Sequence, residues 1–281
     1  MLLEPSALLA RLPIRVIDYQ AVASPFADAT HCVYRLVADE GVFALKLLRD
    51  TPTPFWLGMD ALFEVKLAQQ VTRSTDHYAC AADAFSWRVP SLIDYASASP
   101  KLPTYLLTTW FTGDPIDPTS VSDQLIEDMA HADAQRHQKK QMNWGRAVAP
   151  FYSMQEWQAR IATLLPNVSR DALMSLSQPD GFVPMIMDMR WDQCLQQQGR
   201  LSALVDMDAF VYAPKTLELV LMEYWLTPAE LIVWRQTYLD CGGELPTLRD
   251  VRSLYRQLLW SWQIFGPIPE PEWMQWPIFF D

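Results

Sequence analysis

Carboxylate and amide side chains follow two apolar segments in the second half of the chain. Asp188 comes directly after the apolar run 183–187, and Gln193 follows it five positions later. Asp206 and Asp208 come directly after a second apolar run. Carboxylate and amide oxygens suit Mg²⁺, and a carboxylate can also take a proton from a substrate hydroxyl. These four residues are therefore the first candidates for chemistry.

The segment between Gln193 and Asp206 has the pattern of a β-hairpin. Residues 198–199 form a Gln-Gly turn sequence, and 201–205 reads as the returning strand. If the two strands pair about this turn, Gln193 lies roughly opposite Asp206, and Asp188 can reach the same end. This predicts an oxygen-rich site suited to Mg²⁺. The alternative is that the aspartates only cap turns.

Two further charged residues lie on otherwise apolar faces in the first half. Lys46 lies inside the strand-like run 42–48, and Glu64 lies on the apolar stripe of the helical pattern 56–71. A buried ammonium is costly unless it meets a negative partner, so we expect Lys46 and Glu64 to form an ion pair. The alternative is a lysine that reaches solvent and a glutamate at the edge of its stripe.

The elements that must position these residues change in type along the chain. The first hundred residues alternate between strand and helix patterns, with short strands expected at 14–22, 31–37, 42–48 and 105–111. A turn at 39–41 joins the second and third of these strands. After residue 112, helices are expected at about 120–137, 227–240 and 247–265, and the strand-rich segment 183–205 lies among them.

This order predicts an α+β fold with two lobes. The small lobe, residues 1–111, is rich in strands, and the larger lobe, residues 112–281, is mainly helical. Ligands commonly bind in the cleft between two such lobes.

Composition excludes several classes of protein. The 281 residues are 50% hydrophobic, with 22 Lys and Arg against 33 Asp and Glu and a net charge of −11, which disfavours nucleic-acid binding. Most of the acid excess falls in the helical lobe. No apolar run has the length of a membrane span, and the early acidic residue without a basic segment argues against a secretory signal. Four scattered cysteines form no disulfide framework, so we expect a cytoplasmic protein.

The sequence also lacks the motifs of several large enzyme groups. It has no Gly-x-Ser-x-Gly elbow, no Walker A loop and no Gly-x-Gly-x-x-Gly fingerprint, which disfavours serine hydrolases, P-loop enzymes and dinucleotide-binding enzymes.

Five features follow one another along the sequence: a lysine in a strand, a glutamate in a helix, an aspartate with an amide five positions later, a hairpin, and a further aspartate. This order resembles the protein-kinase-like fold. The pattern is most similar to the aminoglycoside phosphotransferase and choline kinase branch. The linker 106–113 resembles the inter-lobe hinge of that family, whose backbone holds adenine. The resemblance spans residues 14 to about 226, and its specificity lies in a handful of positions.

The resemblance implies a nucleotide site between the lobes, with ATP or another nucleoside triphosphate as the cofactor. Lys46 would contact the α- and β-phosphates and would be held by Glu64. Thr109 and Phe111, in the hinge, would bind the nucleotide base.

It also implies roles for the second cluster. Asp188 would orient the acceptor hydroxyl or take its proton. Asp206 would bind the Mg²⁺ that bridges the phosphates, and Gln193 would bind the second metal in place of the family's Asn. Asp208 would assist the metal site.

Three positions depart from the family pattern. Ile186 and Met187 replace the His-Gly that precedes the catalytic Asp, and Gln193 is one methylene longer than the usual Asn. The expected phosphate loop, 23–31, contains no glycine, although glycine allows backbone amides to approach phosphates closely.

The function expected from these residues is an ATP- and Mg²⁺-dependent phosphotransferase that acts on a small hydroxylated molecule. The acidic helical lobe and its tryptophans would suit a cationic acceptor. The alternatives are a pseudokinase that binds a nucleotide or a partner without transfer, and an acidic scaffold without a nucleotide. The sequence leaves the oligomeric state and the identity of the acceptor open.

Overall fold

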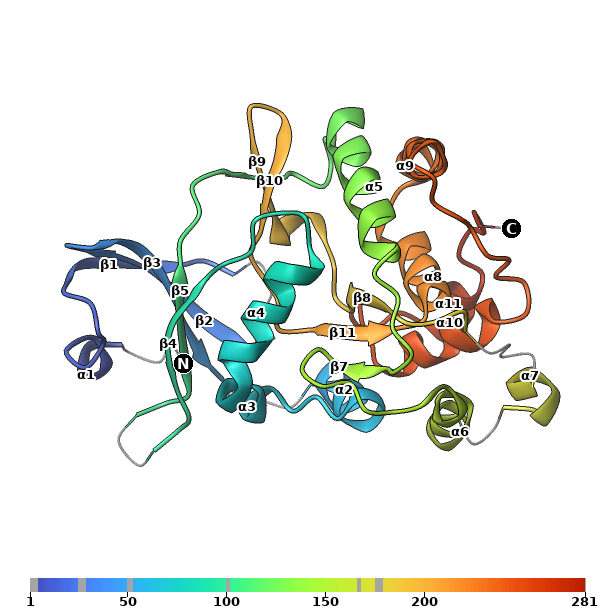
Figure 1. The fold of residues 1–281 in the computed structure, drawn as a ribbon, viewed down its shortest axis with the longest axis horizontal. Helices are drawn as coiled ribbons and strands as arrows, with labels where there is room; N and C mark the ends of the chain where they lie inside the picture. Colours follow the sequence, from blue (N-terminus) through green and yellow to red (C-terminus); the bar gives the residue numbers. More distant parts are fainter. Residues whose placement is uncertain are drawn as a thin grey trace.

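A five-stranded antiparallel sheet forms one end of the molecule (Figure 1). The computed structural model describes residues 5–24, 29–49, 53–99, 102–165, 168–174 and 179–280. Its strands, in spatial order, are β1 (Val16–Val22), β2 (His31–Ala38), β3 (Gly41–Leu48), β5 (Tyr105–Thr109) and β4 (Leu92–Ala96). The predicted turn between β2 and β3 is confirmed, with Ala38 paired to Gly41. Residues 25–28 of the expected phosphate loop lie outside the described residues.

Strand alternation gives this sheet a core of its own. Burial in β2 alternates along the whole strand, as expected for a sheet with one face packed on a core. Leu45 and Leu47 of β3 are fully buried in that core, and Leu8 of the short helix α1 (Ser6–Leu9) covers it. Lys46 lies between the two leucines in sequence, so its side chain projects from the opposite face.

The helices that follow β3 pack with the rest of the chain. Four segments connect β3 to β4: α2 (Pro54–Phe63), α3 (Leu67–Gln70), η1 (Val71–Arg73) and α4 (Ser74–Ala84). Met59 and Tyr78, from α2 and α4, belong to the larger core that extends to Phe280. A Cβ atom on Gly58 would lie 2.4 Å from the Trp262 ring, so only glycine allows this close approach of α2 to that ring.

The expected helix over 56–71 is wrong in its extent. Helix α2 begins at Pro54, with Thr53 as the N-cap, and ends at Glu64, which has a left-handed backbone with φ 55°. The backbone N–H of Glu64 donates to the carbonyl oxygens of Asp60 and Met59, which closes the last turn. The chain then reverses, and α4 begins ten residues later.

The second half of the chain is mainly helical, as predicted. Its helices are α5 (Asp123–His137), α6 (Met154–Leu164), α7 (Arg170–Met174), α8 (Lys215–Trp225), α9 (Pro228–Asp240), α10 (Arg252–Ser261) and α11 (Glu270–Met274). Ser122 caps α5, and Thr227 and Glu230 form the expected capping box of α9. Helix α10 is shorter than the expected 247–265.

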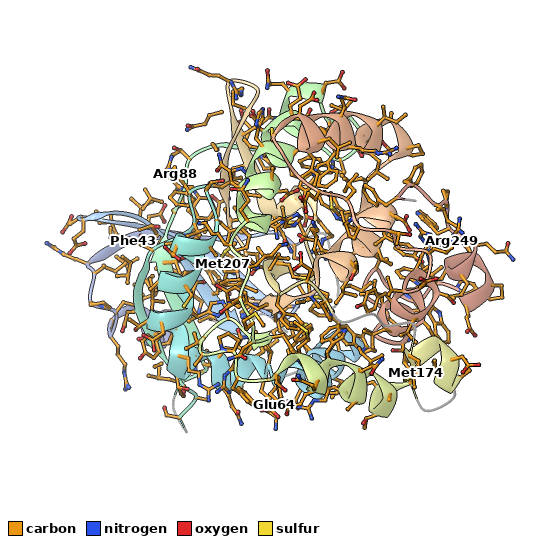
Figure 2. The ribbon with its side chains drawn as sticks, turned by 45° about the vertical axis from the view of Figure 1, so that its right-hand side comes forward. Phe43, Glu64, Arg88, Met174, Met207 and Arg249 are labelled. Carbon is orange, nitrogen blue, oxygen red and sulfur yellow. The ribbon has the colours of Figure 1, made fainter. Side chains whose placement is uncertain are left out.

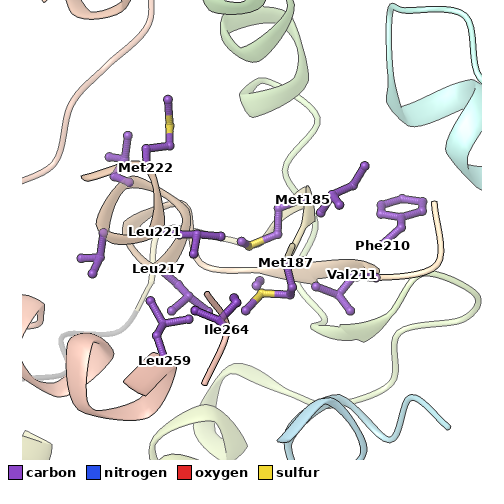
Figure 3. Close-up of a cluster of buried hydrophobic side chains, with 14 of the residues drawn as sticks. Met185, Met187, Phe210, Val211, Leu217, Leu221, Met222, Leu259 and Ile264 are labelled. Atoms are coloured by element: carbon purple, nitrogen blue, oxygen red, sulfur yellow. The ribbon is translucent and has the colours of Figure 1, made fainter. Parts of the chain in front are cut away.

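Two small sheets lie between the five-stranded sheet and the helices. One contains β10 (Arg200–Leu204), β9 (Cys194–Gln197) and β6 (Asp114–Pro115), and the other contains β7 (Gly145–Arg146), β11 (Phe210–Ala213) and β8 (Val183–Ile186). Met185, Met187 and Val211 anchor the second sheet on Leu217, Leu221 and other residues of the helical core (Figure 3). The strand-rich segment expected at 183–205 is therefore confirmed.

The C-terminal segment that contains Trp273, Phe279 and Phe280 packs on helix α8. Glu223 of α8 is fully buried and lies 2.8 Å from Arg256 and 3.2 Å from Arg252. The Tyr224 ring stacks on Trp273 with centroids 3.8 Å apart. Glu223 also accepts a hydrogen bond from the backbone of Phe280, so the end of the described chain is fixed to the helical core.

Candidate active site

Lys46 of β3 connects the five-stranded sheet to the second half of the chain. Its side chain is 7% exposed, and its Nζ donates to Asp206 Oδ1 at 2.9 Å and to Asp208 Oδ2 at 3.1 Å. Burial alone would lower the pKa of Lys46, but the two carboxylates outweigh it and hold this pKa well above its ordinary value. The lysine is therefore charged, and its partners come from a segment about 160 residues away.

The predicted ion pair between Lys46 and Glu64 is wrong. Glu64 is half exposed, bonds the Tyr152 hydroxyl and lies 2.9 Å from an Arg160 nitrogen. Figure 2 shows Glu64 at the edge of the molecule, well separated from Met207 at the centre. The left-handed backbone that ends α2 at Glu64 removes this residue from the helical stripe on which the prediction depended.

Helix α4 takes the place beside Lys46 that the sequence assigned to the helix of Glu64. The Tyr78 hydroxyl is buried without a hydrogen-bond partner among the described residues. Burial raises the pKa of Tyr78, and the hydroxyl stays protonated beside the lysine. His77 Nε2 lies 2.7 Å from the carbonyl oxygen of Met207. Met207 lies between Asp206 and Asp208 in the sequence. Sequence reasoning missed α4, although its Ser74 and Asp76 are typical of a helix start.

Asp188 follows β8 on a short, tethered loop. The Met187 backbone N–H donates to the Ala209 carbonyl oxygen at 3.1 Å, so the loop is held next to the Asp206–Asp208 segment. Desolvation, followed by the charge of Asp206, raises the pKa of Asp188 to about 7. A carboxylate with this pKa is suited to accept a proton near neutral pH.

The hairpin between Gln193 and Asp206 forms as predicted. Gln198 and Gly199 both have positive φ, as a two-residue hairpin turn requires, and Arg200 pairs with Gln197. The Val205 backbone N–H donates to the Gln193 carbonyl oxygen at 2.9 Å, which brings Gln193 beside Asp206.

The Gln193 side-chain amide makes no hydrogen bond within the described part of the protein. It is 4% exposed, and neither its amide oxygen nor its amide nitrogen has a hydrogen-bond partner among the described residues. A buried polar atom without a partner costs about 1–3 kcal/mol, so an amide in this state is suited to a ligand that the protein itself does not supply.

Two carboxylates share one ammonium at this site. Asp206 is about one third exposed and Asp208 is nearly buried, and both contact Lys46. Lys46 and His31 hold the pKa of Asp208 below its ordinary value against burial, whereas burial and the charge of Asp208 raise that of Asp206. The charges of Asp206 and Asp208 also act on Asp188, and the charge of Arg190 compensates them in part.

A divalent cation fits this donor set. Among the described residues, no group of three or more His, Cys, Asp or Glu side chains is placed to hold a metal ion. Mg²⁺ does not need one, since it usually takes one or two carboxylates and fills its remaining positions with water and phosphate oxygens. Asp206 and the unpartnered Gln193 amide are the residues that would hold it.

The hinge residues Thr109 and Phe111 lie at the end of β5. The Trp110 backbone N–H donates to the Val42 carbonyl oxygen at 3.1 Å, and that of Thr109 donates to Ser91 at 2.9 Å. Within the described residues, the Phe111 backbone N–H has no acceptor. The Arg88 guanidinium lies 4.3 Å from the centroid of the Phe111 ring and holds this aromatic side chain.

A buried charge network supports the helical side of the site. Arg136 of α5 is 2.7 Å from Glu218 of α8 and 2.6 Å from Asp133, and it also donates to the Pro184 carbonyl oxygen of β8. His137 Nε2 lies 2.8 Å from Glu218. The network fixes β8, and therefore Asp188, between two helices. Sequence analysis did not identify it, because its members are far apart along the chain.

The order of the elements and the strand–loop–hairpin site define the protein-kinase-like fold, in the form found in aminoglycoside and macrolide phosphotransferases. The predicted fold class and resemblance are confirmed. No protein-family model matches the chain, and no curated protein sequence matches it significantly.

Three solved structures illustrate the similarity. A macrolide 2′-phosphotransferase from Brachybacterium faecium is 14% identical with a TM-score of 0.53, over 94% of this chain and 99% of that one. A spectinomycin phosphotransferase in complex with ADP and spectinomycin is 13% identical (TM-score 0.56; 94% and 87%). A thermostable mutant of an aminoglycoside phosphotransferase, with ADP and hygromycin B, is 15% identical (TM-score 0.57; 96% and 94%). Within the described part of the chain, no helix is both long and apolar enough to cross a bilayer.

Proposed function

We propose that this protein is an ATP- and Mg²⁺-dependent phosphotransferase that acts on a small hydroxylated molecule. One observation carries the proposal: the carboxylates of Asp206 and Asp208 contact a single lysine beside a buried amide that has no partner among the described residues. This arrangement leaves negative charge and an unused oxygen ligand at one point. Phosphoryl transfer needs a metal ion and a cation at such a point, because charge develops on the phosphate oxygens.

The nucleotide would lie between the sheet and the hairpin. We assign the adenine to the hinge, where the free Phe111 N–H can donate to it and Thr109 ends β5. Lys46 would contact the α- and β-phosphates, and its bonds to Asp206 and Asp208 hold its ammonium in position.

The metal and the proton have separate residues in this proposal. Asp206 and Gln193 would hold Mg²⁺, which neutralises the phosphate charge when it is bound. Asp208 positions Lys46 and supports the metal site. Asp188, whose pKa is about 7, would orient the acceptor hydroxyl and take its proton.

A pocket beside the catalytic loop is our candidate for the acceptor. It is lined by Met189, the residue after Asp188, and by Trp87 and Trp225. Asp133 and Glu218 also line it and add negative charge, although Arg136 compensates part of it. Aromatic faces with an acidic surround favour a cationic acceptor such as a hydroxylated amine.

A pseudokinase is the second candidate, and one observation favours it. Tyr78, a neutral residue, lies beside Lys46 where the family pattern implies a glutamate. Such a protein would bind a nucleotide without transferring phosphate.

A thermal-shift titration with ATP, with and without Mg²⁺, combined with a transfer assay on a panel of hydroxylated amines, tests the proposal. We expect a rise of Tm that requires Mg²⁺, together with ATP-dependent phosphorylation of at least one amine. A metal-independent rise without transfer supports the pseudokinase, and the absence of any rise contradicts a nucleotide site.

Asp206→Asn and Asp180→Asn form a matched pair for this experiment. Asp180 is an exposed carboxylate that pairs with Lys140 and makes no hydrogen bond or ion pair with Lys46, Asp188, Gln193, Asp206 or Asp208. The Mg²⁺-dependent rise should disappear in Asp206→Asn and remain in Asp180→Asn. An equal effect in both variants would mean that the metal binds elsewhere.

A further inference from the structure

A second cavity lies beside His77, whose Nε2 contacts the Met207 carbonyl oxygen. It lies between the end of α2, α3, the start of α4 and β7. Its polar lining is rich in nitrogen donors: Lys66, Gln69, Gln70, Arg73, His77 and Arg146. A basic cavity is unexpected in a chain with a net charge of −11.

Two arginines give the cavity its charge. Arg146 is held in place, because its Nε donates to the Val148 carbonyl oxygen at 3.1 Å and its guanidinium lies 5.1 Å from the Phe151 ring centroid. Arg73 precedes α4 and, among the described residues, has neither a hydrogen-bond acceptor nor a carboxylate partner. Both guanidinium groups therefore retain N–H donors for a ligand.

The carboxylate of the cavity is already engaged. Glu64 lines one side, and its Oε1 accepts hydrogen bonds from Tyr152 and Arg160. Burial and the nearby charge of Arg73 lower the pKa of Arg146, which reflects two like charges held close together. An anion in the cavity would remove this repulsion.

We propose that this cavity binds the phosphate group of a small phosphate monoester. Two guanidinium forks offer paired donors in the geometry that phosphate oxygens accept, and Gln70 adds an amide donor. Free inorganic phosphate presents the same type of oxygen atoms to the two guanidinium groups, so it is the simpler ligand with this chemistry.

The cavity is separate from the Lys46 cluster but is connected to it. His77 lines the cavity and contacts the Met207 carbonyl oxygen, and Arg146 of β7 pairs with Val211 of β11, the strand that follows Asp208. The bound phosphate therefore contacts the residues that hold the Asp206–Asp208 segment, without touching a proposed metal ligand.

Isothermal titration calorimetry of the full chain tests this site, in buffer without sulfate, phosphate or nucleotide. The probes are inorganic phosphate and glycerol 3-phosphate. We expect saturable binding of one equivalent, weakened at least about tenfold in Arg73→Gln and in Arg146→Gln, since each loses a charge-assisted hydrogen bond. Tighter binding of glycerol 3-phosphate would identify a phosphorylated metabolite as the ligand, and equal binding would identify free phosphate.

Arg249→Gln is the matched control, because Arg249 is an exposed arginine that lies well away from Glu64, which lines the cavity (Figure 2). Its binding should equal that of the parent protein. Arg73→Gln should also leave the Tm of the anion-free protein unchanged or higher, because it removes a repulsion and no hydrogen bond. Absence of saturable binding, or equal binding in all three variants and the parent, would overturn the proposal.

Discussion

Replacing Gln193 by leucine should stabilise the ligand-free protein and remove its Mg²⁺-dependent affinity for ATP. The Gln193 side chain is buried, and both of its polar amide atoms lack partners, so the folded state has a desolvation penalty of about 1–3 kcal/mol. Leucine has a similar volume and no polar atom, which removes the penalty. The backbone bond from Val205 to the Gln193 carbonyl oxygen is unaffected.

A gain of this size is measurable. For a chain of this length, 1 kcal/mol corresponds to roughly 2–4 °C in Tm, so Gln193→Leu should raise the Tm of the free protein by about 2–12 °C. Calorimetry of ATP with Mg²⁺ on the same sample should show weakened binding, because the amide oxygen is lost.

Gln193→Asn is the control for this experiment, since it keeps the amide oxygen on a shorter side chain. It should retain part of the Mg²⁺-dependent affinity and gain little stability. The reasoning would be refuted if Gln193→Leu lowered the Tm, or if it bound ATP and Mg²⁺ as tightly as the parent protein.

Three further predictions concern the site and its support. Asp206→Ala should abolish Mg²⁺-dependent ATP binding in calorimetry, whereas Asp188→Ala should retain binding and lose phosphate transfer; equal loss of binding in both would contradict the division of roles. Glu223→Ala should lower the free energy of unfolding in urea by about 3–5 kcal/mol, because it leaves buried arginines unpaired; a loss below 1 kcal/mol would argue against the network. Burial lowers the pKa of His137, and Arg136 outweighs burial to lower that of Glu218 to about 2, so these two groups bind fewer protons in the folded protein than in the unfolded chain. Their contribution to stability should therefore decrease below about pH 6.5 through the histidine and further between about pH 4.5 and 2 through Glu218. Asp188, whose pKa is raised to about 7, acts in the opposite sense, so the measurement uses Asp188→Asn, in which a urea midpoint that rises on acidification would contradict this.

Local signals predicted the elements whose ends are set by their own residues. The capping box at Thr227 and the cap at Ser122 satisfy free N–H groups within one turn of the helix, so neighbouring residues determine where α9 and α5 begin. The Gln198-Gly199 turn fixes the register of its hairpin in the same way, and through it the position of Gln193 beside Asp206.

The partner of Lys46 could not be predicted, because tertiary contacts decide it. The apolar stripe around Glu64 continues past the point where α2 ends, and the stop depends on the bonds of Glu64 to Tyr152 and Arg160, almost a hundred residues later. Sequence spacing could show that Lys46 needs a negative partner. It could not show that two aspartates after the hairpin would meet this need.

The position of Glu223 has a consequence for the order of folding. Its carboxylate accepts hydrogen bonds from the backbones of Phe279 and Phe280 and pairs with Arg252 and Arg256, so helix α8 cannot bury this charge until those later residues are present. During synthesis the helical core, including the helices next to Asp188, must therefore wait for residues 252–280 to leave the ribosome. Truncation before Phe279 would leave a chain with most of its sequence but with a loosened core, a species that chaperones and proteases recognise.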